Sequence, residues 1–504
     1  MISLKEKIAT TRTSRVARFA RTDLFFVLLL STLNLAIRIY RFKYPIFEFR
    51  QTQTAFGVRS ILRNEMSILR ADIPVLGPPW KIPLEFPIYQ YLSAIASKIT
   101  GTDVVYASLL TASVIFTACG IATFFLIRMT IGSVPARIAL GIFYFSSFGL
   151  FHGTSVRIDF TSVLFFLIAM IALLKFLVRQ RIYLVGLIFL MASLGALTKI
   201  TTAIPWVLFG MLPLVFLSSS KTRTKLLTAT TLFATFIPTL FWNRYADSIK
   251  SENIHTQFLM SENLYEWNFG TIKQRTDMNL WQHLFDHFFG STIGVYQLVF
   301  LFVLIAIFFS EHRKVASIFI AIFVSGPAIF ANLYLVHDYY AIAVFPALVA
   351  VISIAINTVM LSFKSRLRPS QIVVLPILAS FFLIILSWTS SEGTENMNSV
   401  VPKELIRPFP QFDEIKEFTN LNDNLLVINP DWDPTLLFLV DRKGLMLRPD
   451  GTRPDNSELG TTYRFVYWEQ IEPTIDDWNF YFPENLEFKV LSDNFFEIFP
   501  INKK

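Results

Sequence analysis

Long apolar segments recur along this chain, and they restrict its fold more than any other feature. Most of them approach the roughly 20 residues that an α-helix needs to cross a lipid bilayer. We therefore predict a polytopic α-helical membrane protein with about eleven transmembrane helices. The predicted spans are residues 24–40, 104–127, 138–151, 160–177, 182–198, 200–218, 226–242, 292–309, 315–335, 341–361 and 371–388.

The composition of the 504 residues supports a membrane protein. Hydrophobic residues make up 53% and charged residues only 16%, whereas a soluble domain normally has about 25% charged residues. The net charge of +8 does not indicate a nucleic-acid partner, because many basic residues lie in short loops between apolar spans. Cys119 is the only cysteine, which excludes an intrachain disulfide and a cysteine-based zinc site.

Basic residues predict the orientation in the membrane. If the basic N-terminus (residues 1–23) is cytoplasmic, five cytoplasmic loops each carry Lys or Arg, as the positive-inside rule requires. These loop residues are Arg128 and Arg137; Arg179 and Arg181; Lys221, Arg223 and Lys225; Arg313 and Lys314; and Lys364, Arg366 and Arg368. The transmembrane domain is then residues 24–388. Its large loops 41–103 and 243–291 lie on the outer face, together with the C-terminus.

The C-terminal residues 389–504 differ in composition from the rest of the chain. They are rich in acidic residues and proline and contain short strand-like runs at 425–428 and 463–467, with a helical pattern at 412–419. We predict a small extracytoplasmic α/β domain, large enough for its own modest core.

Polar residues gather in the segments assigned to the outer face. The set comprises Glu48, Arg50, Gln51, Gln53, Glu85, His152, Arg157, Asp159, Lys199, His337, Asp338, Tyr339 and Tyr340. Charges at a membrane rim are costly without a partner and indicate a site. Arg and Lys can hold a lipid-linked phosphate and stabilise it as a leaving group. A carboxylate can take the proton of an attacking acceptor.

The ordered motifs that hold these residues resemble the bacterial members of the membrane-embedded GT-C glycosyltransferases. The similarity is to the group containing protein O-mannosyltransferases (glycosyltransferase family 39-like) and the lipid A aminoarabinose transferase. The motifs cover the first 350 residues in the expected order. They are residues 50–55, 85–91, 157–159, 194–199 and 337–340, the last followed by Pro346.

The resemblance implies transfer of a sugar from a polyprenyl-phosphate donor to a lipid, glycan or protein acceptor, on the outer face of a bacterial cytoplasmic membrane. Relatives usually carry an acidic pair where this chain has Arg50 and Gln51. Glu48 and Asp159 are therefore the candidate catalytic bases. The predicted donor-binding residues are Arg50, Gln51, Gln53, Glu85, Arg157, Lys199, His337, Tyr339 and Tyr340.

The sequence does not decide whether a divalent metal ion is a cofactor; Glu85 and His255 are weak candidate ligands. Two other functions stay open as well. A transporter or flippase of lipid-linked sugars would place its polar residues near the bilayer midplane, often in repeated halves. A surface-glycan polymerase or ligase would use a diphosphate-linked donor and the same outer-face cations.

Overall fold

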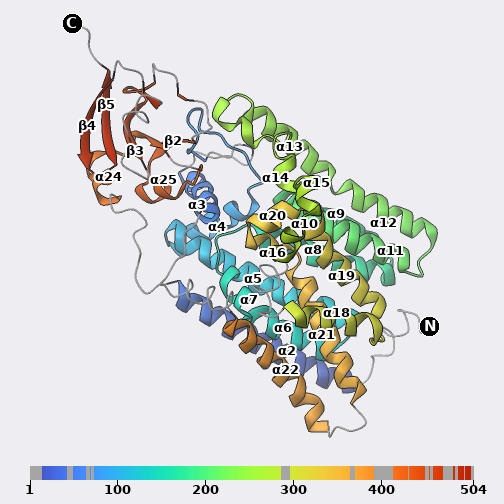
Figure 1. Ribbon diagram of the computed structural model, residues 1–504. Coiled ribbons are helices and arrows are strands. Elements are labelled where there is room, and N and C mark those ends of the chain that lie inside the picture. Colours follow the sequence, from blue (N-terminus) through green and yellow to red (C-terminus); the bar gives the residue numbers. More distant parts are fainter. Residues whose placement is uncertain are drawn as a thin grey trace. The chain divides into compact units, whose positions relative to one another are not determined.

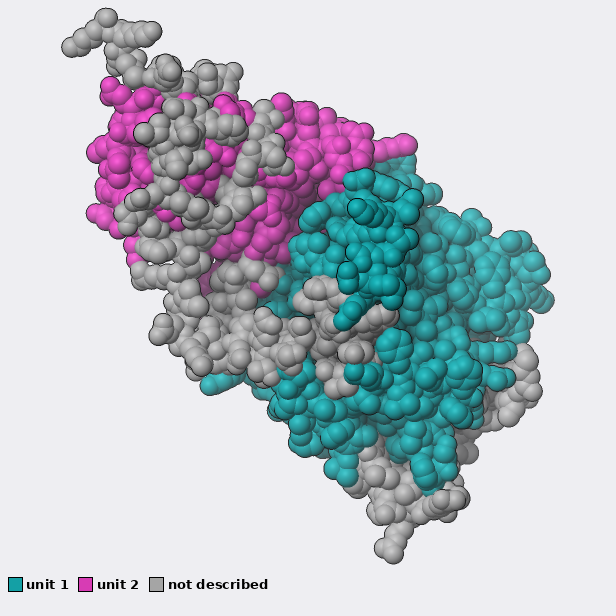
Figure 2. All heavy atoms as spheres, in the orientation of Figure 1, with its two compact units in different colours: residues 1–45, 109–242, 265–401 teal, residues 46–108, 243–264, 402–504 magenta. Residues whose placement is uncertain are grey.

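The computed structural model forms two compact units (Figure 2). Unit 1 comprises residues 1–45, 109–242 and 265–401, and unit 2 comprises residues 46–108, 243–264 and 402–504. The structure describes residues 14–42, 49–63, 69, 73–284, 296–363, 369–390, 412–428, 431–448, 453–454, 458–468, 481–482, 486–492 and 494–500.

Unit 1 is helical in its described residues (Figure 1). Its helices are α2 (Ser14–Arg41), α5 (Val104–Thr130), α6 (Ser133–Phe145), α7 (Ser147–His152), α8 (Asp159–Arg179), α9 (Ile182–Thr198), α10 (Ile200–Ile204), η1 (Pro205–Met211), α11 (Leu212–Leu217), α12 (Thr222–Ala234), α13 (Ile237–Lys250), α14 (Tyr265–Phe269), α15 (Ile272–Thr276), α16 (Met278–Leu284), α18 (Tyr296–Phe308), α19 (Arg313–Ile329), α20 (Ala331–Val336), η4 (Asp338–Ala343), α21 (Phe345–Ser362) and α22 (Pro369–Thr389). Helices α5 and α13 continue into residues of unit 2.

Six helical stretches are long and apolar enough to cross a membrane, by length and composition, within the residues described. They are Asp23–Tyr40, Val104–Thr130, Asp159–Arg179, Ile200–Leu217, Thr222–Lys250 and Phe345–Ser362. Four shorter apolar helices accompany them: Ser133–Phe145, Ile182–Thr198, Gln297–Phe308 and Ile377–Thr389. The helical membrane-protein character is confirmed, while the number of about eleven spans stays a prediction.

Helix α2 shows why these helices suit a bilayer. It exposes Leu24, Phe25 and Leu28 and buries the polar side chains Asn34 and Arg38. Asn34 donates to the Thr117 hydroxyl (2.8 Å), and Arg38 donates to Asn34 (2.9 Å). Polar groups inside a helical bundle and apolar groups outside it are the arrangement expected where lipid is the solvent.

Unit 2 contains a five-stranded sheet in the order β2-β1-β3-β5-β4. Strands β1 (Asn424–Ile428), β2 (Lys443–Leu447) and β3 (Tyr463–Trp468) are parallel, and β4 (Leu486–Ser492) and β5 (Phe495–Pro500) are antiparallel. Helices α24 (Phe412–Phe418) and α25 (Thr435–Val440) complete the α/β domain (Figure 1). The predicted strands at 425–428 and 463–467 and the helix at 412–419 are therefore confirmed.

The first large loop contains two helices that were not predicted, α3 (Phe49–Leu62) and α4 (Ile88–Thr100). Residues 74–77 of this loop pair with the edge strand β2. The Gly444 amide donates to the Pro74 carbonyl (3.0 Å), and the Gly77 amide donates to the Gly444 carbonyl (3.2 Å). Gly77 has φ of +76°, a backbone conformation that favours glycine. Helix η2 (Ile254–Leu259) belongs to the same unit.

Candidate functional site

An antiparallel pair of helices brings Asp159 and Lys199 together in unit 1. Asp159 is the first residue of α8, and Lys199 lies between the end of α9 and the start of α10. Each helix rises about 1.5 Å per residue, so two helices of similar length return the chain to the level where it began. Close packing fixes their register: the Ser162 hydroxyl donates to the Gly195 carbonyl (2.8 Å), and a Cβ at Gly195 would meet the Phe166 ring at 2.7 Å.

Asp159 and Lys199 form a buried ion pair, in which Lys199 Nζ donates to Asp159 Oδ1. Their side chains are only 1% and 4% exposed. The carboxylate at the start of α8 and the ammonium at the end of α9 each complement the partial charge of that helix terminus. Asp159 Oδ2 is buried without a hydrogen-bond partner in the described part of the chain, and a carboxylate oxygen can accept a hydrogen bond.

Aromatic rings border the ion pair. Lys199 Nζ lies 4.1 Å from the centre of the Tyr340 ring and 5.0 Å from that of Tyr339. The rings of His337 and Tyr339, and those of Tyr339 and Tyr340, are stacked with centres 5.0 Å apart. Helix α14 adds Trp267, whose ring meets His337 edge to face at 5.9 Å. The short helix η4 carries Tyr339 and Tyr340, and His337 directly precedes it.

A second charged group shares the Tyr339 ring. The Arg157 guanidinium carbon lies 4.5 Å from the centre of that ring. Its Nη1 donates to His152 Nδ1 (2.8 Å), and His152 Nε2 lies 3.4 Å from Asp338 Oδ2. Because His152 Nδ1 accepts from Arg157, the proton of a neutral imidazole is on Nε2, facing Asp338. His152 and Arg157 are buried, whereas the Asp338 side chain is 28% exposed.

Unit 2 contains a polar cluster on the first loop. Arg50 on α3 donates to Gln53 Oε1 and forms an ion pair with Glu85. Gln51 and Gln53 are buried, at 1% and 2% exposure, while Glu85 is 30% exposed at its side chain. Burial of two amide side chains on one helix requires polar partners, and this cluster can hold the polar atoms of a ligand.

The other predicted residues lie elsewhere. Glu48 lies outside the described residues. His255 lies in η2, with its ring 3.8 Å from a Cβ position at Gly77, and burial lowers its pKa. Within the described ranges no three His, Cys, Asp or Glu side chains are grouped to hold a metal ion, so neither His255 nor Glu85 has a companion set of ligands there.

The structure adds residues that were not among the predicted catalytic or donor-binding residues. His152 and Asp338 belonged to the predicted outer-face set, but their proximity to each other was not foreseen. Tyr334 was not predicted at all: it is buried in α20, and its ring centre lies 6.0 Å from that of Tyr340. Gly326 makes room for it, because a Cβ there would meet the Tyr334 hydroxyl at 2.3 Å.

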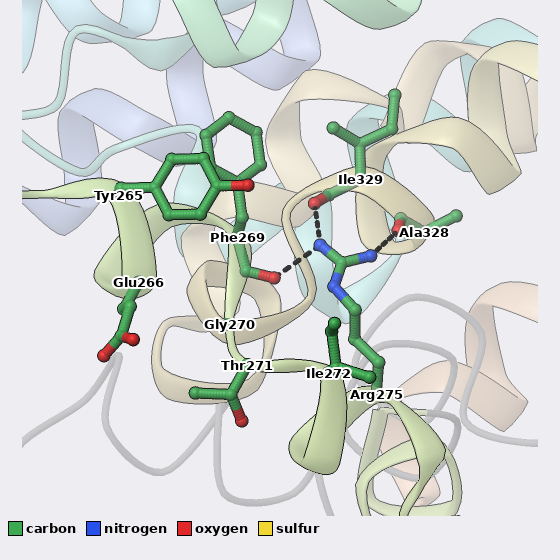
Figure 3. A pocket seen from close by; sticks show the side chains of 9 residues that line it. All are labelled: Tyr265, Glu266, Phe269, Gly270, Thr271, Ile272, Arg275, Ala328 and Ile329. Carbon is green, nitrogen blue, oxygen red and sulfur yellow. Dashed lines mark hydrogen bonds between the residues drawn. The ribbon is translucent and has the colours of Figure 1, made fainter.

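A surface cavity of about 560 Å³ lies beside α14 and α15 (Figure 3). Arg275 lies within its wall, where it donates to the carbonyls of Ala328 (2.8 Å), Ile329 (2.5 Å) and Phe269. These carbonyls end α19 and α14, so the guanidinium satisfies helix C-termini. Arg275 thus serves the backbone of this wall rather than a ligand.

Comparisons with known proteins place the fold. No protein-family model and no curated protein sequence matches the chain. Its structure is similar to that of ArnT from Cupriavidus metallidurans bound to undecaprenyl phosphate, with a TM-score of 0.61, 11% identity, and coverage of 94% of this chain and 97% of that one.

Two further solved structures are similar over most of this chain. The archaeal oligosaccharyltransferase AglB from Archaeoglobus fulgidus, in complex with an inhibitory peptide and a dolichol-phosphate, gives a TM-score of 0.54 at 12% identity, covering 88% of this chain and 69% of that one. The arabinofuranosyltransferase AftD from Mycobacteria gives a TM-score of 0.54 at 10% identity, covering 92% of this chain and 37% of that one. Similarity at these identities is a similarity of fold.

Proposed function

Since this chain has the fold of the GT-C membrane glycosyltransferases, we propose that it is an integral-membrane glycosyltransferase. It transfers a sugar from a polyprenyl-phosphate donor to a lipid, glycan or protein acceptor on the outer face of the cytoplasmic membrane. The solved structures of ArnT and AglB contain undecaprenyl phosphate and dolichol-phosphate, and this supports the same class of lipid for this chain.

The observation that carries the proposal is the buried Asp159–Lys199 pair under a stack of aromatic rings. An ion pair that only stabilised a membrane bundle would be an expensive choice, because desolvation offsets most of its attraction. Here Asp159 keeps one buried oxygen without a hydrogen bond in the described residues. Such an arrangement suits a site that receives a polar ligand.

In the proposed reaction the acceptor attacks the anomeric carbon of the sugar. The new bond joins the acceptor atom to that carbon, and the bond from the carbon to the phosphate oxygen breaks with its electron pair. Lys199 and Arg157 stabilise the charge that grows on the departing polyprenyl phosphate. A carboxylate takes the acceptor proton. Glu48 is the first candidate for this base and Asp159 the second.

The remaining groups bind the substrates. Tyr339, Tyr340 and His337 offer ring faces and polar edges of the kind that suit an amphipathic membrane interface. Arg50, Gln51, Gln53 and Glu85 supply donors and acceptors for the polar part of the donor. In this assignment the ion pair with Asp159 also orients the Lys199 ammonium so that Lys199 can bind the donor phosphate.

Binding of the lipid product tests the assignment directly. Undecaprenyl phosphate is titrated onto the purified protein in detergent and the complex is counted by native mass spectrometry. We expect the Lys199→Met variant to bind at least tenfold more weakly than the wild type, and a Lys273→Met variant, which changes an exposed lysine of α15, to bind normally. Equal binding by wild type and Lys199→Met refutes the phosphate role.

The alternatives differ in what happens to the lipid. A flippase moves labelled lipid-linked sugar across proteoliposomes without breaking the sugar–phosphate bond, and Glu48→Gln and Asp159→Asn leave that movement intact. A polymerase or ligase acts only on a diphosphate-linked donor. Covalent transfer from a monophosphate-linked donor, lost in Glu48→Gln or Asp159→Asn and in Lys199→Ala, supports the proposed enzyme and neither alternative.

A further inference from the structure

One face of helix α3 packs on the C-terminal sheet domain within unit 2. The α3 residues in this contact are Phe49, Thr52, Phe56 and Arg59, followed by Arg63 just beyond the helix. Their spacing of three or four residues places them along a single stripe of the helix surface. We call these five residues the docking stripe.

The docking stripe contacts helix α25 and the residues that flank it. The Thr52 and Thr435 hydroxyls are 3.1 Å apart, and Thr435 also donates to Asp433 Oδ1 (2.5 Å). The Phe56 ring meets Phe438 edge to face at 5.4 Å. The Thr52–Thr435 and Phe56–Phe438 contacts each join the first loop to a segment almost four hundred residues later in the chain, so they are made only when the C-terminal domain is folded.

Asp441 closes the contact at the end of α25. Arg59 Nη1 donates to its Oδ1 (2.9 Å) and Arg63 Nη2 to its Oδ2 (2.6 Å). Arg59 Nη1 also donates to the Phe438 carbonyl (2.8 Å), a group near the C-terminus of α25, where a cation is favoured. Asp441 itself has φ of +61°, an uncommon conformation for a residue other than glycine, which turns the chain toward β2.

The opposite side of α3 rests on α4. Val58 and Ile61 form a small core with Ala94, and a Cβ at Gly57 would lie 3.1 Å from Gln90. Helix α3 is thus held from two sides, and its rotation about its own axis is fixed. Arg50 does not belong to the docking stripe; it pairs with Gln53 and Glu85 instead.

We propose that the C-terminal sheet domain is the frame that orients helix α3, with Asp441 and Thr435 as positioning residues for the cluster of Arg50, Gln53 and Glu85. This inference gives the C-terminal domain a role inside the transferase rather than an appended one. It rests on the proposed function in so far as this cluster binds the donor. Residues 74–77, which extend the sheet beside β2, tie the same loop to the domain a second time.

The first readout of the test does not depend on activity. Hydrogen exchange of the α3 amides is followed by mass spectrometry in wild type, Asp441→Asn and the matched variant Glu417→Gln, an exposed carboxylate of α24. We expect exchange over residues 49–62 to be about fivefold faster in Asp441→Asn, the size of effect that partly exposed ion pairs give, and unchanged in Glu417→Gln. Unchanged protection of α3 in Asp441→Asn overturns the proposal.

A second variant covers the case in which Asp441→Asn fails to fold. Thr435→Val keeps the side-chain volume and removes the hydroxyl that faces Thr52, so faster exchange in α3 is again expected. In the transfer assay both variants should lower kcat/KM for the donor several-fold, and a kcat/KM equal to that of the wild type contradicts positioning of the cluster. If the wild type transfers no sugar, the proposed function fails, while the exchange result still decides whether the domain orients α3.

Discussion

The ion pair between Lys199 and Asp159 allows stability and function to be separated. In the Lys199→Met variant the Asp159 carboxylate, whose side chain is 1% exposed, loses its partner. Breaking a buried ion pair by removing one charge costs about 3–5 kcal/mol. The upper part of that range is expected here, because Asp159 Oδ2 already lacks a hydrogen bond among the described residues.

The double variant Lys199→Met/Asp159→Leu removes both charges. Replacing a buried pair with apolar side chains of similar size is often neutral for stability, so its thermal unfolding midpoint in detergent should return toward that of the wild type. Sugar transfer should not return. Loss of one group that stabilises the charged transition state lowers kcat by roughly 10²–10³-fold, and the double variant lacks this group as well.

Thermal unfolding and initial transfer rates are measured on the wild type, the single variant, the double variant and Lys199→Arg. Arginine keeps the charge, so that variant should retain more stability than Lys199→Met. Recovery of transfer in the double variant would show that the pair serves only the fold. An unchanged unfolding midpoint in Lys199→Met would contradict the expected cost of an unpaired buried carboxylate at Asp159.

Three other positions give separate tests: the glycine between α8 and α9, the carboxylate that faces His152, and the carboxylate at the end of α25. Gly195→Leu brings a side chain against the Phe166 ring, so it should destabilise the α8–α9 pair by about 1–3 kcal/mol and lower the unfolding midpoint. Asp338→Asn removes the charge that faces His152 and Arg157 and should reduce transfer at least tenfold with little change in folding; wild-type rates would contradict a role in the site. Burial alone would raise the pKa of Asp441, but the Arg63 hydrogen bond and the Arg59 and Arg63 charges hold this pKa below the ordinary 3.8. The contact of Asp441 with α3 is therefore fully stabilising above about pH 4, and it weakens as the pH falls through the lowered pKa. Hydrogen exchange of α3, corrected for the intrinsic rate, should rise at that acidic pH in the wild type and less in Asp441→Asn.

Much of the helical unit was predictable from the sequence, because a continuous apolar segment of about 20 residues directly predicts a membrane helix. The break at Lys199 was also foreseen, since a charge interrupts an apolar run there. Its pairing with Asp159 follows from two antiparallel helices of similar length. The proximity of His152 to Asp338 was not predictable, because no local pattern relates segments so distant in the chain.

The first loop shows where sequence patterns fail. Its helix α3 carries buried Gln51, Thr52, Gln53 and Thr54, residue types that give no apolar period and read as a polar loop. The helix is stabilised by contacts with α25 and α4 rather than by its own amphipathic pattern. The strand-like pairing of residues 74–77 with β2 was missed for a related reason, because so short a segment has no alternation to detect.

The proposed reaction is covalent transfer of a sugar from a polyprenyl monophosphate. Its decisive measurement incubates proteoliposomes of the purified protein with undecaprenyl-phosphate-linked labelled hexoses and pentoses and extracts of cell-envelope acceptors, and quantifies the undecaprenyl phosphate released. We expect release together with labelled acceptor for at least one donor, and we expect Lys199→Met to abolish both. Movement of intact donor across the bilayer with no release, or release that persists in Lys199→Met, would contradict it.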